Sequence, residues 1–409
     1  MLRFSAPRGR VEVHEARTIT DVRRVLRAAL DAWSDRLPPR DARVVLKPNL
    51  NNDLVALSGN CTDLRVLAAL ITELKSRGYA DLCVADGSNV GVARRDIDTF
   101  RRLRVAGLAE ALGVRTRDLN RDEGREIPLQ AGATPTIAAT ILDADFLISL
   151  PKIKTHAEAG LSCAMKNWVG IARGQDKRHM HYDLGRNIFA INEVVLPDLI
   201  VVDGLVGMEG NGPGDGDPFR FDRIVVSDDA FLNDLVVCRL IDLPWRDVPY
   251  LVHAFDAGHL DLPLAERIGA ELPVIRPIRR APPRSRLAEL SEARSLNWLK
   301  LAVRPLVERP EVAEAAYRLK IIQDVYRRDD DTLRLVGRDA SRCGDCARCV
   351  DYCPTGLPLA DIGVRLDPPD CVQCLYCWWV CPSDALRLDG EPNAMARQIE
   401  RYKPQIERM

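Results

Sequence analysis

The chain has almost no net charge, because 58 lysines and arginines face 59 acidic residues among 409. That balance gives no reason to expect general attraction to nucleic acid or to a membrane surface. No run of residues comes near the ~20 consecutive apolar side chains that a membrane-spanning helix needs. The N-terminus lacks both the apolar stretch of a secretory signal and a twin-arginine leader. We therefore expect a cytoplasmic protein with no nucleic-acid and no membrane partner.

Several common motifs are also missing. There is no G-x-x-x-x-G-K-[ST] loop, and the glycine-rich stretch 204–218 is interrupted by Pro213 and Pro218. A nucleotide site on the basis of these glycines is therefore weakly supported. No nucleophile elbow and no Ser-His-Asp order is visible. A hydrolase or transferase is for that reason the weakest functional hypothesis.

Cysteine, by contrast, is concentrated in one short segment. Eight of the 12 cysteines form two runs with the spacing C-x2-C-x2-C-x3-C-P, which begin at Cys343 and Cys371. Corresponding cysteines are 28 residues apart, which indicates an internal duplication. In this spacing three thiolates bind one iron–sulfur cube, and the fourth binds the other cube. We predict two [4Fe-4S] clusters, one on a first cysteine set (Cys343, Cys346, Cys349 and Cys381) and one on a second cysteine set (Cys371, Cys374, Cys377 and Cys353).

Paired zinc knuckles are the alternative for these cysteines. Zinc usually takes four ligands in two separated pairs, often with histidine, and this segment has no histidine. Thiolate ligands also suit a reducing compartment. The four other cysteines have no common spacing and are expected to be small buried residues; they are Cys61, Cys83, Cys163 and Cys238.

Residues 340–390 resemble a bacterial-type two-cluster ferredoxin module. The resemblance lies in the two Cys-Pro endings, in Thr355-Gly356 and in Ser383-Asp384-Ala385-Leu386. It implies electron transfer, with one electron per cluster. The spacing alone does not fix the reduction potentials or the direction of transfer.

Residues 11–276 alternate short β-branched runs with helical patterns. The runs predict strands at 11–14, 43–46, 82–85, 126–129, 136–140, 146–150, 199–202 and 223–226. The helical patterns lie at 19–33, 62–77, 100–112, 161–172, 187–195 and 229–241. Continuous apolar strands are typical of parallel sheets that are covered on both faces. The sequence therefore predicts a doubly wound, mostly parallel α/β sheet.

A proline- and arginine-rich stretch at 275–286 marks a change of character. We expect an α/β substrate-binding domain over 1–276 and a helical linker over 277–338, with helices at 287–303 and 312–326. A small α+β ferredoxin-like domain with two clusters should follow over 339–390. The polar tail, 391–409, would pack back onto the protein or fray.

Polar residues follow four of the predicted strands directly. In open parallel sheets, ligands bind outside the carboxyl ends of the strands. Four such endings at one edge indicate a binding site. The endings are Lys47-Pro48-Asn49, Asp86-Gly87-Ser88-Asn89, Pro151-Lys152-Ile153-Lys154-Thr155-His156 and Asp203-Gly204.

Lysines near these endings suggest a site for a carboxylate or a phosphate. Lys152 and Lys154 are expected to converge only if the chain turns, and Ser162 and Lys166 should share one helical face. The alternative is separate surface lysines with solvated ammonium groups. Stretch 204–218 is expected to be a mobile lid or a plain surface loop. The predicted substrate-binding residues are Lys47, Asn49, Asp86, Ser88, Asn89, Lys152, Lys154, Ser162, Asn167, Asp203, Glu209 and Asn211.

Proton donors are needed if a substrate is reduced at this edge. His156, His181 and Lys166 are the candidate catalytic residues, since histidine titrates near neutral pH. His179 and His181 form a conceivable metal pair, for which no third ligand is evident. A purely structural role remains open for each histidine.

Motifs spread over residues 40–240 together resemble one family, called domain of unknown function 362. They are Lys47-Pro48-Asn49, Leu150-Pro-Lys-Ile-Lys-Thr-His156, Ala164-Met-Lys-Asn167 with Gly170, Pro197-Asp198, Asp203-Gly204 and Gly207-Met-Glu-Gly-Asn-Gly-Pro213. Members often carry a C-terminal two-cluster ferredoxin module. The resemblance implies an iron–sulfur protein of the redox type and supplies no reaction.

These features together favour an oxidoreductase. Electrons from a soluble protein would pass through two clusters to an anionic small molecule at the sheet edge. Alternatively, the chain is an electron-transfer or assembly partner of another redox enzyme and has no substrate. Trp378 and Trp379 would then form a docking surface, although shielding of a cluster from solvent is the favoured role for them.

Overall fold

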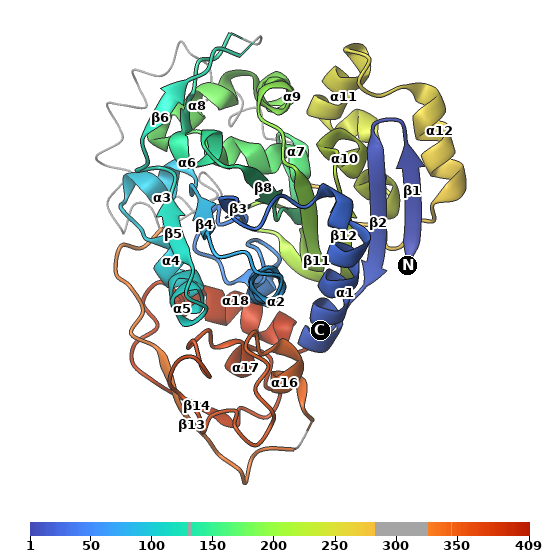
Figure 1. The fold of residues 1–409 in the computed structure, drawn as a ribbon. Helices are drawn as coiled ribbons and strands as arrows, with labels where there is room; N and C mark the ends of the chain where they lie inside the picture. Colours follow the sequence, from blue (N-terminus) through green and yellow to red (C-terminus); the bar gives the residue numbers. More distant parts are fainter. Residues whose placement is uncertain (130–131, 283–325, 345) are drawn as a thin grey trace.

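A ten-stranded sheet forms the centre of the computed structural model, which describes residues 1–129, 132–282, 326–344 and 346–409 (Figure 1). The strand order is β1-β2-β12-β11-β8-β3-β4-β5, with β9 beside β11 and β10 beside β9. The strands from β11 to β5 are parallel, and β12, β2 and β1 extend the sheet in antiparallel fashion. Their bounds are β1 (Leu2–Ala6), β2 (Gly9–Glu15), β3 (Val44–Lys47), β4 (Leu82–Asp86), β5 (Arg115–Asp118), β8 (Phe146–Ser149), β9 (Lys152–His156), β10 (Gly160–Ser162), β11 (Leu199–Glu209) and β12 (Asp217–Ser227).

Successive residues of the central strands enter two different cores. In β3, Val44 and Leu46 face one core and Val45 faces the other, as the two-residue period of a strand requires. Helices α1 (Ile19–Ala32), α2 (Leu64–Ser76) and α5 (Val105–Ala111) cover the first face. The second face is covered by α7 (Ala164–Asn167), α9 (Leu184–Val194) and α10 (Ala230–Leu240). The predicted α/β fold with a large, mostly parallel sheet is confirmed.

Side-chain caps explain where several of the predicted helices begin. Thr18 accepts a hydrogen bond from the Asp21 backbone, and the Asp21 side chain accepts one in return. Asp63 caps α2 by accepting the Arg65 N–H, and Asp229 caps α10 by accepting the Leu232 N–H. The remaining elements of the α/β domain are α3 (Val90–Arg94), α4 (Thr99–Arg102), α6 (Ala139–Leu142), α8 (Lys177–Met180), α11 (Pro249–Asp256), α12 (Leu262–Glu271), β6 (Gly124–Glu126) and β7 (Thr136–Ala138).

Three local predictions were wrong. The helix expected over 100–112 is two helices, because Arg104 adopts a left-handed conformation with φ 61° between α4 and α5. The helix expected over 161–172 is strand β10 followed by the short α7, so Ser162 and Lys166 do not share a helical face. Residues 204–209, expected to belong to a lid or surface loop, are part of strand β11, because β11 stays paired with β12 as far as Glu209.

The C-terminal segment forms a small module against the α1, α2 and α5 face of the sheet (Figure 1). Its strands β13 (Arg334–Arg338) and β14 (Leu386–Asp389) pair with each other. The module therefore begins inside the range predicted as helical linker, whose two expected helices lie almost entirely outside the described residues. The tail packs back through α18 (Ala396–Ile406), which contacts β12.

The duplication seen in the sequence is repeated in the backbone. Helices α16 (Arg348–Tyr352) and α17 (Tyr376–Trp379) begin at corresponding positions. The residue before each has a left-handed conformation, with φ 57° at Ala347 and 63° at Leu375. Both fourth cysteines accept a backbone N–H, Cys353 from Leu357 at 3.4 Å and Cys381 from Ala385 at 3.3 Å. The two runs therefore fold into the same local structure.

Among the described residues, no helix combines the length and the apolar character that crossing a bilayer requires.

Candidate active site and cysteine module

The polar endings of four neighbouring strands lie at one edge of the sheet. β11, β8, β3 and β4 are adjacent, and β9 continues the path of β8 along β11. Lys47 Nζ lies 2.5 Å from Asp86 Oδ1, and Lys152 Nζ lies 2.7 Å from Asp203 Oδ2. All four side chains are buried. Two of the predicted anion-binding lysines are thus already neutralised by carboxylates.

Lys154 reaches the same edge but has no carboxylate partner. Its Nζ donates to Asn49 Oδ1 at 2.9 Å and to the Asn60 carbonyl at 2.8 Å. Burial lowers the pKa of Lys154 to about 7. The prediction that Lys152 and Lys154 need a turn in order to converge was wrong. Both belong to the extended strand β9, and residues two apart in a strand share a face.

A further buried lysine, Lys177, was missed from the sequence. Its Nζ donates to the Ser88 carbonyl at 3.0 Å and to Asn120 Oδ1. Burial lowers the pKa of Lys177 to about 7, with Asp86 opposing the effect. Lys177 begins α8, 91 residues after Asp86, and no motif marks it. We call Lys47, Lys152, Lys154, Lys166 and Lys177 together the lysine edge.

Lys166 differs from the other members of the lysine edge. It is half-buried, and it makes no hydrogen bond or ion pair within the described parts of the chain. Burial lowers the pKa of Lys166 to about 8, while Glu158 opposes the effect and Lys47 adds to it. Its neighbour Asn167 is buried and accepts from Lys47 at 3.2 Å. Lys166 is therefore the ammonium group of this edge that is available to a ligand.

A buried acid binds the N-terminus of the helix that carries Lys166. Asp234 of α10 accepts the backbone N–H groups of Ala164 at 2.8 Å and Met165 at 3.1 Å. It also accepts from the Tyr250 hydroxyl at 3.1 Å. Burial raises the pKa of Asp234. Because α7 has only one turn, these bonds fix the direction in which it leaves β10.

The two candidate histidines have different surroundings. His156 is buried, and its Nδ1 accepts the N–H groups of Glu158 and Ala159, both at 3.1 Å. Only Nε2 of His156 can therefore carry the proton of the neutral ring. His181 lies near the surface, with Nδ1 3.4 Å from Glu158 Oε2. Glu158, which was not predicted, is thus common to the surroundings of Lys166 and both histidines.

Other predicted site residues are engaged elsewhere or support the edge indirectly. Glu209 pairs with Arg276 at 3.0 Å and accepts the Arg279 N–H at 3.0 Å. Asn211 donates to Asp215 at 3.3 Å. Asn89 caps α3, and Ser162 lies opposite Lys154 in the β9–β10 pair. His179 stacks on Tyr182.

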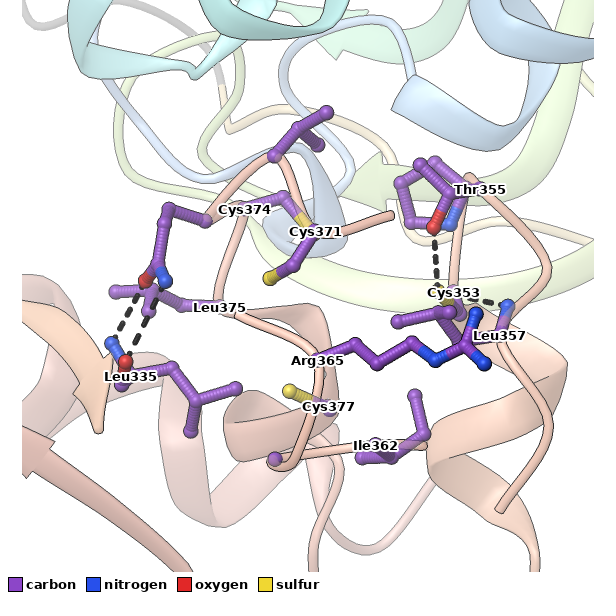
Figure 2. A pocket seen from close by; sticks show the side chains of 14 residues that line it. Leu335, Cys353, Thr355, Leu357, Ile362, Arg365, Cys371, Cys374, Leu375 and Cys377 are labelled. Carbon is purple, nitrogen blue, oxygen red and sulfur yellow. Dashed lines mark hydrogen bonds between the residues drawn. The ribbon is translucent and has the colours of Figure 1, made fainter. Parts of the chain in front are cut away.

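The cysteine module brings the second cysteine set together around one space. Cys353, Cys371, Cys374 and Cys377 line a cavity of about 400 Å3, including its mouth, with Arg365 also on its wall (Figure 2). Three of them come from one loop, and Cys353 comes from the other run of the duplication. This is the crossover that the spacing predicts, so the residues present fit an iron–sulfur cube.

The first cysteine set is grouped in the same way. Burial raises the pKa of Cys349 to about 11, and its neighbours Cys346, Cys343 and Cys381 act in the same direction. Among the described residues, no three His, Cys, Asp or Glu side chains are close enough to share a single metal ion.

The N-terminus of α2 touches both the module and the lysine edge. Tyr376 directly precedes Cys377, and its hydroxyl accepts the Leu64 N–H at 3.2 Å. The Asp63 N–H donates to Asp203 at 2.6 Å, and Asp203 pairs with Lys152. The Arg65 guanidinium also lies 4.1 Å from the Tyr352 ring. A short series of contacts therefore links the two regions.

The paired tryptophans of the module do not form an open surface. Trp379 is fully buried, and Trp378 is half-buried with Lys403 Nζ 4.6 Å from its ring centre. This arrangement favours shielding over docking.

Comparisons with known proteins bear on the α/β part of the chain. Residues 44–239 match the family described as Domain of unknown function (DUF362), which confirms the predicted resemblance for that range. Thylakoid-associated protein sll1697 of Synechocystis sp. is 29% identical over 258 residues, which cover 59% of this chain and 75% of that protein. Among solved structures, the lactate racemase apoprotein of Thermoanaerobacterium thermosaccharolyticum is similar with a TM-score of 0.35 and 13% identity. That similarity covers 53% of this chain and 54%, about half, of that protein.

Proposed function

We propose that this chain is an iron–sulfur oxidoreductase that reduces an anionic small molecule held at the lysine edge, with electrons from a soluble donor protein. The observation that supports this most is the position of the α2 N-terminus. Asp63 binds Asp203 of the edge, and the next residue, Leu64, binds Tyr376 of the module. A redox module that merely shared the chain with the α/β domain would not need this connection.

The two cysteine sets would hold the [4Fe-4S] clusters, four thiolates each. When bound, such clusters supply one-electron transfer. The module and the α/β domain share one hydrophobic core, in which Cys353, Cys377 and Tyr376 pack with Leu64 and Leu67. This shared core holds the second cysteine set against the α/β domain. Burial of this kind excludes water from the space between the two regions.

The charges at the lysine edge favour an anion. Lys47 and Lys152 have carboxylate partners, but Lys154, Lys166 and Lys177 do not. An arriving carboxylate or phosphate would bind Lys166 directly and would be attracted by the other two ammonium groups. The bond to Lys166 and the attraction by Lys154 and Lys177 are both strong, because these side chains lie in surroundings that are poor in water.

Proton delivery can come from the same side chains. A two-electron reduction takes up two electrons and two protons, while the donor protein is oxidised. Lys166, with a pKa of about 8, can donate one proton, and His181 beside Glu158 can donate the other. His156 could donate only from Nε2, since its Nδ1 accepts backbone N–H groups.

The test uses the full chain, purified anaerobically and reduced with dithionite. Reoxidation is followed by visible absorbance while a panel of oxidised carboxylates and phosphates is added. We expect one class to reoxidise the protein, and Lys166→Met to slow that reaction at least tenfold. Lys75→Met, at an exposed lysine of α2, should leave the rate unchanged. If no anion reoxidises the protein faster than buffer does, the chain is an electron-transfer partner without a substrate.

A further inference from the structure

The α/β domain places an arginine beside the second cysteine set. Arg104 lines a space of about 340 Å3 between the domain and the module, together with Cys374, Tyr376 and Trp379. Its guanidinium donates to the Leu333 carbonyl at 3.0 Å and makes no ion pair with any residue that the structure describes. The side chain is half-buried, so its charge is only partly screened by water.

The neighbouring arginines differ from Arg104 because they form ion pairs. Arg102 lines the same space, but it is paired with Asp53 at 2.7 Å and Asp330 at 2.8 Å. Arg101 is exposed and pairs with Asp330 at 3.0 Å. Arg104 is thus the arginine of this segment that makes no ion pair in the described parts of the chain, although Asp331 lies near enough to act on its charge.

A second residue of this wall carries a buried donor. The Trp379 Nε1 is buried and has no hydrogen-bond partner among the described residues. The positive side chain and the N–H group are therefore held next to the loop that carries Cys371 and Cys374.

The first cysteine set lies in a different environment. Cys346 is exposed, whereas the cysteines of the second set are buried or partly buried, so water screens charges more strongly around the first set. An acidic residue does flank the second set, but Asp370 is only partly buried and lies 3.5 Å from Arg365. Arg104 therefore supplies positive charge on the side of the second set that faces the α/β domain.

We propose that Arg104, assisted by the Trp379 N–H, gives the cluster on the second cysteine set the higher reduction potential of the two. The inference rests on the proposed function only in requiring that both sets hold [4Fe-4S] clusters. Reduction adds one electron, from an external donor, to a centre whose thiolates are already negative. A nearby cation in a region of low dielectric stabilises that extra charge. The added electron is then held on the side of the module that faces the lysine edge.

The experiment is an anaerobic redox titration of the full chain, followed by electron paramagnetic resonance. The wild-type protein should show two separate midpoint potentials. In Arg104→Gln the higher one should fall, so that at fixed solution potential the ratio of reduced to oxidised cluster drops roughly tenfold, equivalent to about 59 mV for one electron. The lower midpoint should not move. Arg104→Lys keeps the charge and should recover most of the shift, and Arg101→Gln should have no effect.

The possible failures can be told apart. Unchanged midpoints in Arg104→Gln, a shift of the lower midpoint alone, or an equal shift in Arg101→Gln would each overturn the inference while leaving the proposed function intact. A wild-type chain without an iron–sulfur signal would instead contradict the proposed function. Should Arg104→Gln lose iron, Trp379→Phe tests the same point, and its higher midpoint should fall by a smaller amount.

Discussion

Anion binding at the lysine edge should draw protons from solution, because three of its lysines are only partly charged near neutral pH. Burial lowers the pKa of Lys154 and Lys177 to about 7 and that of Lys166 to about 8. At pH 8 the free protein therefore carries about 0.1 proton on each of Lys154 and Lys177 and about 0.5 on Lys166. A dianion about 6 Å from an ammonium group, at an effective dielectric constant of ~20, stabilises the charged form by about 5 kcal/mol. That is enough to raise each pKa by about four units.

Isothermal titration calorimetry with sulfate measures this uptake directly. Sulfate stays doubly charged between pH 6 and pH 8, and repeating the titration in buffers of different ionisation enthalpy gives the number of protons taken up. We expect about two protons at pH 8 from Lys154, Lys166 and Lys177, and almost none at pH 6, where these lysines are already charged. Lys154→Met should remove nearly one proton of the uptake at pH 8, whereas Lys75→Met should remove none. Sulfate binding without proton uptake at pH 8 would refute the assignment of partly charged lysines.

Three further outcomes are expected. Asp203→Asn leaves Lys152 as an uncompensated buried cation, which should cost about 3–5 kcal/mol and lower the thermal unfolding midpoint. The exposed pair of Asp145 with Arg43 provides the control, where Asp145→Asn should leave the midpoint almost unchanged. Cys381→Ser and Cys353→Ser should each lower bound iron to about half by emptying opposite cysteine sets, and full retention of iron in either variant would disprove the crossover. Since the folded pKa of Lys154 lies below the unfolded value of 10.5, the unfolded chain binds more protons between pH 7 and 10.5, so the free energy of unfolding should rise with pH by up to about 1.4 kcal/mol per unit. Lys154→Met should flatten that rise in thermal unfolding at pH 7, 8 and 9, and an equally steep rise in the variant would contradict the depressed pKa.

The sequence predicted most of the sheet because its strands are short runs with a clear character. The runs at 43–46 and 82–85 are buried on both faces, and the residues after them must lie at one edge of a parallel sheet. Strand β1 was not predicted, since Leu2–Ala6 alternates only weakly and is stabilised by pairing with β2. Strand β9 was also missed, because its lysines look like loop residues until a buried carboxylate or amide partner is known.

The details of the site depended on contacts that sequence spacing does not reveal. Lys47 and Asp86 are 39 residues apart, and Lys152 and Asp203 are 51 residues apart, so their pairing follows only from the strand order. The start of the helix that carries Lys166 is stabilised by Asp234, 68 residues later, which binds its first N–H groups. Lys177 and Glu158 carry no motif at all. By contrast, the cysteine pattern is local, and its two halves fold alike at matching positions.

The most direct test of the account is the content of iron and inorganic sulfide in the anaerobically purified full chain. Two [4Fe-4S] clusters on the two cysteine sets predict about eight iron atoms and about eight sulfides per chain. Two zinc ions with no sulfide, or a chain free of metal under these conditions, would contradict it.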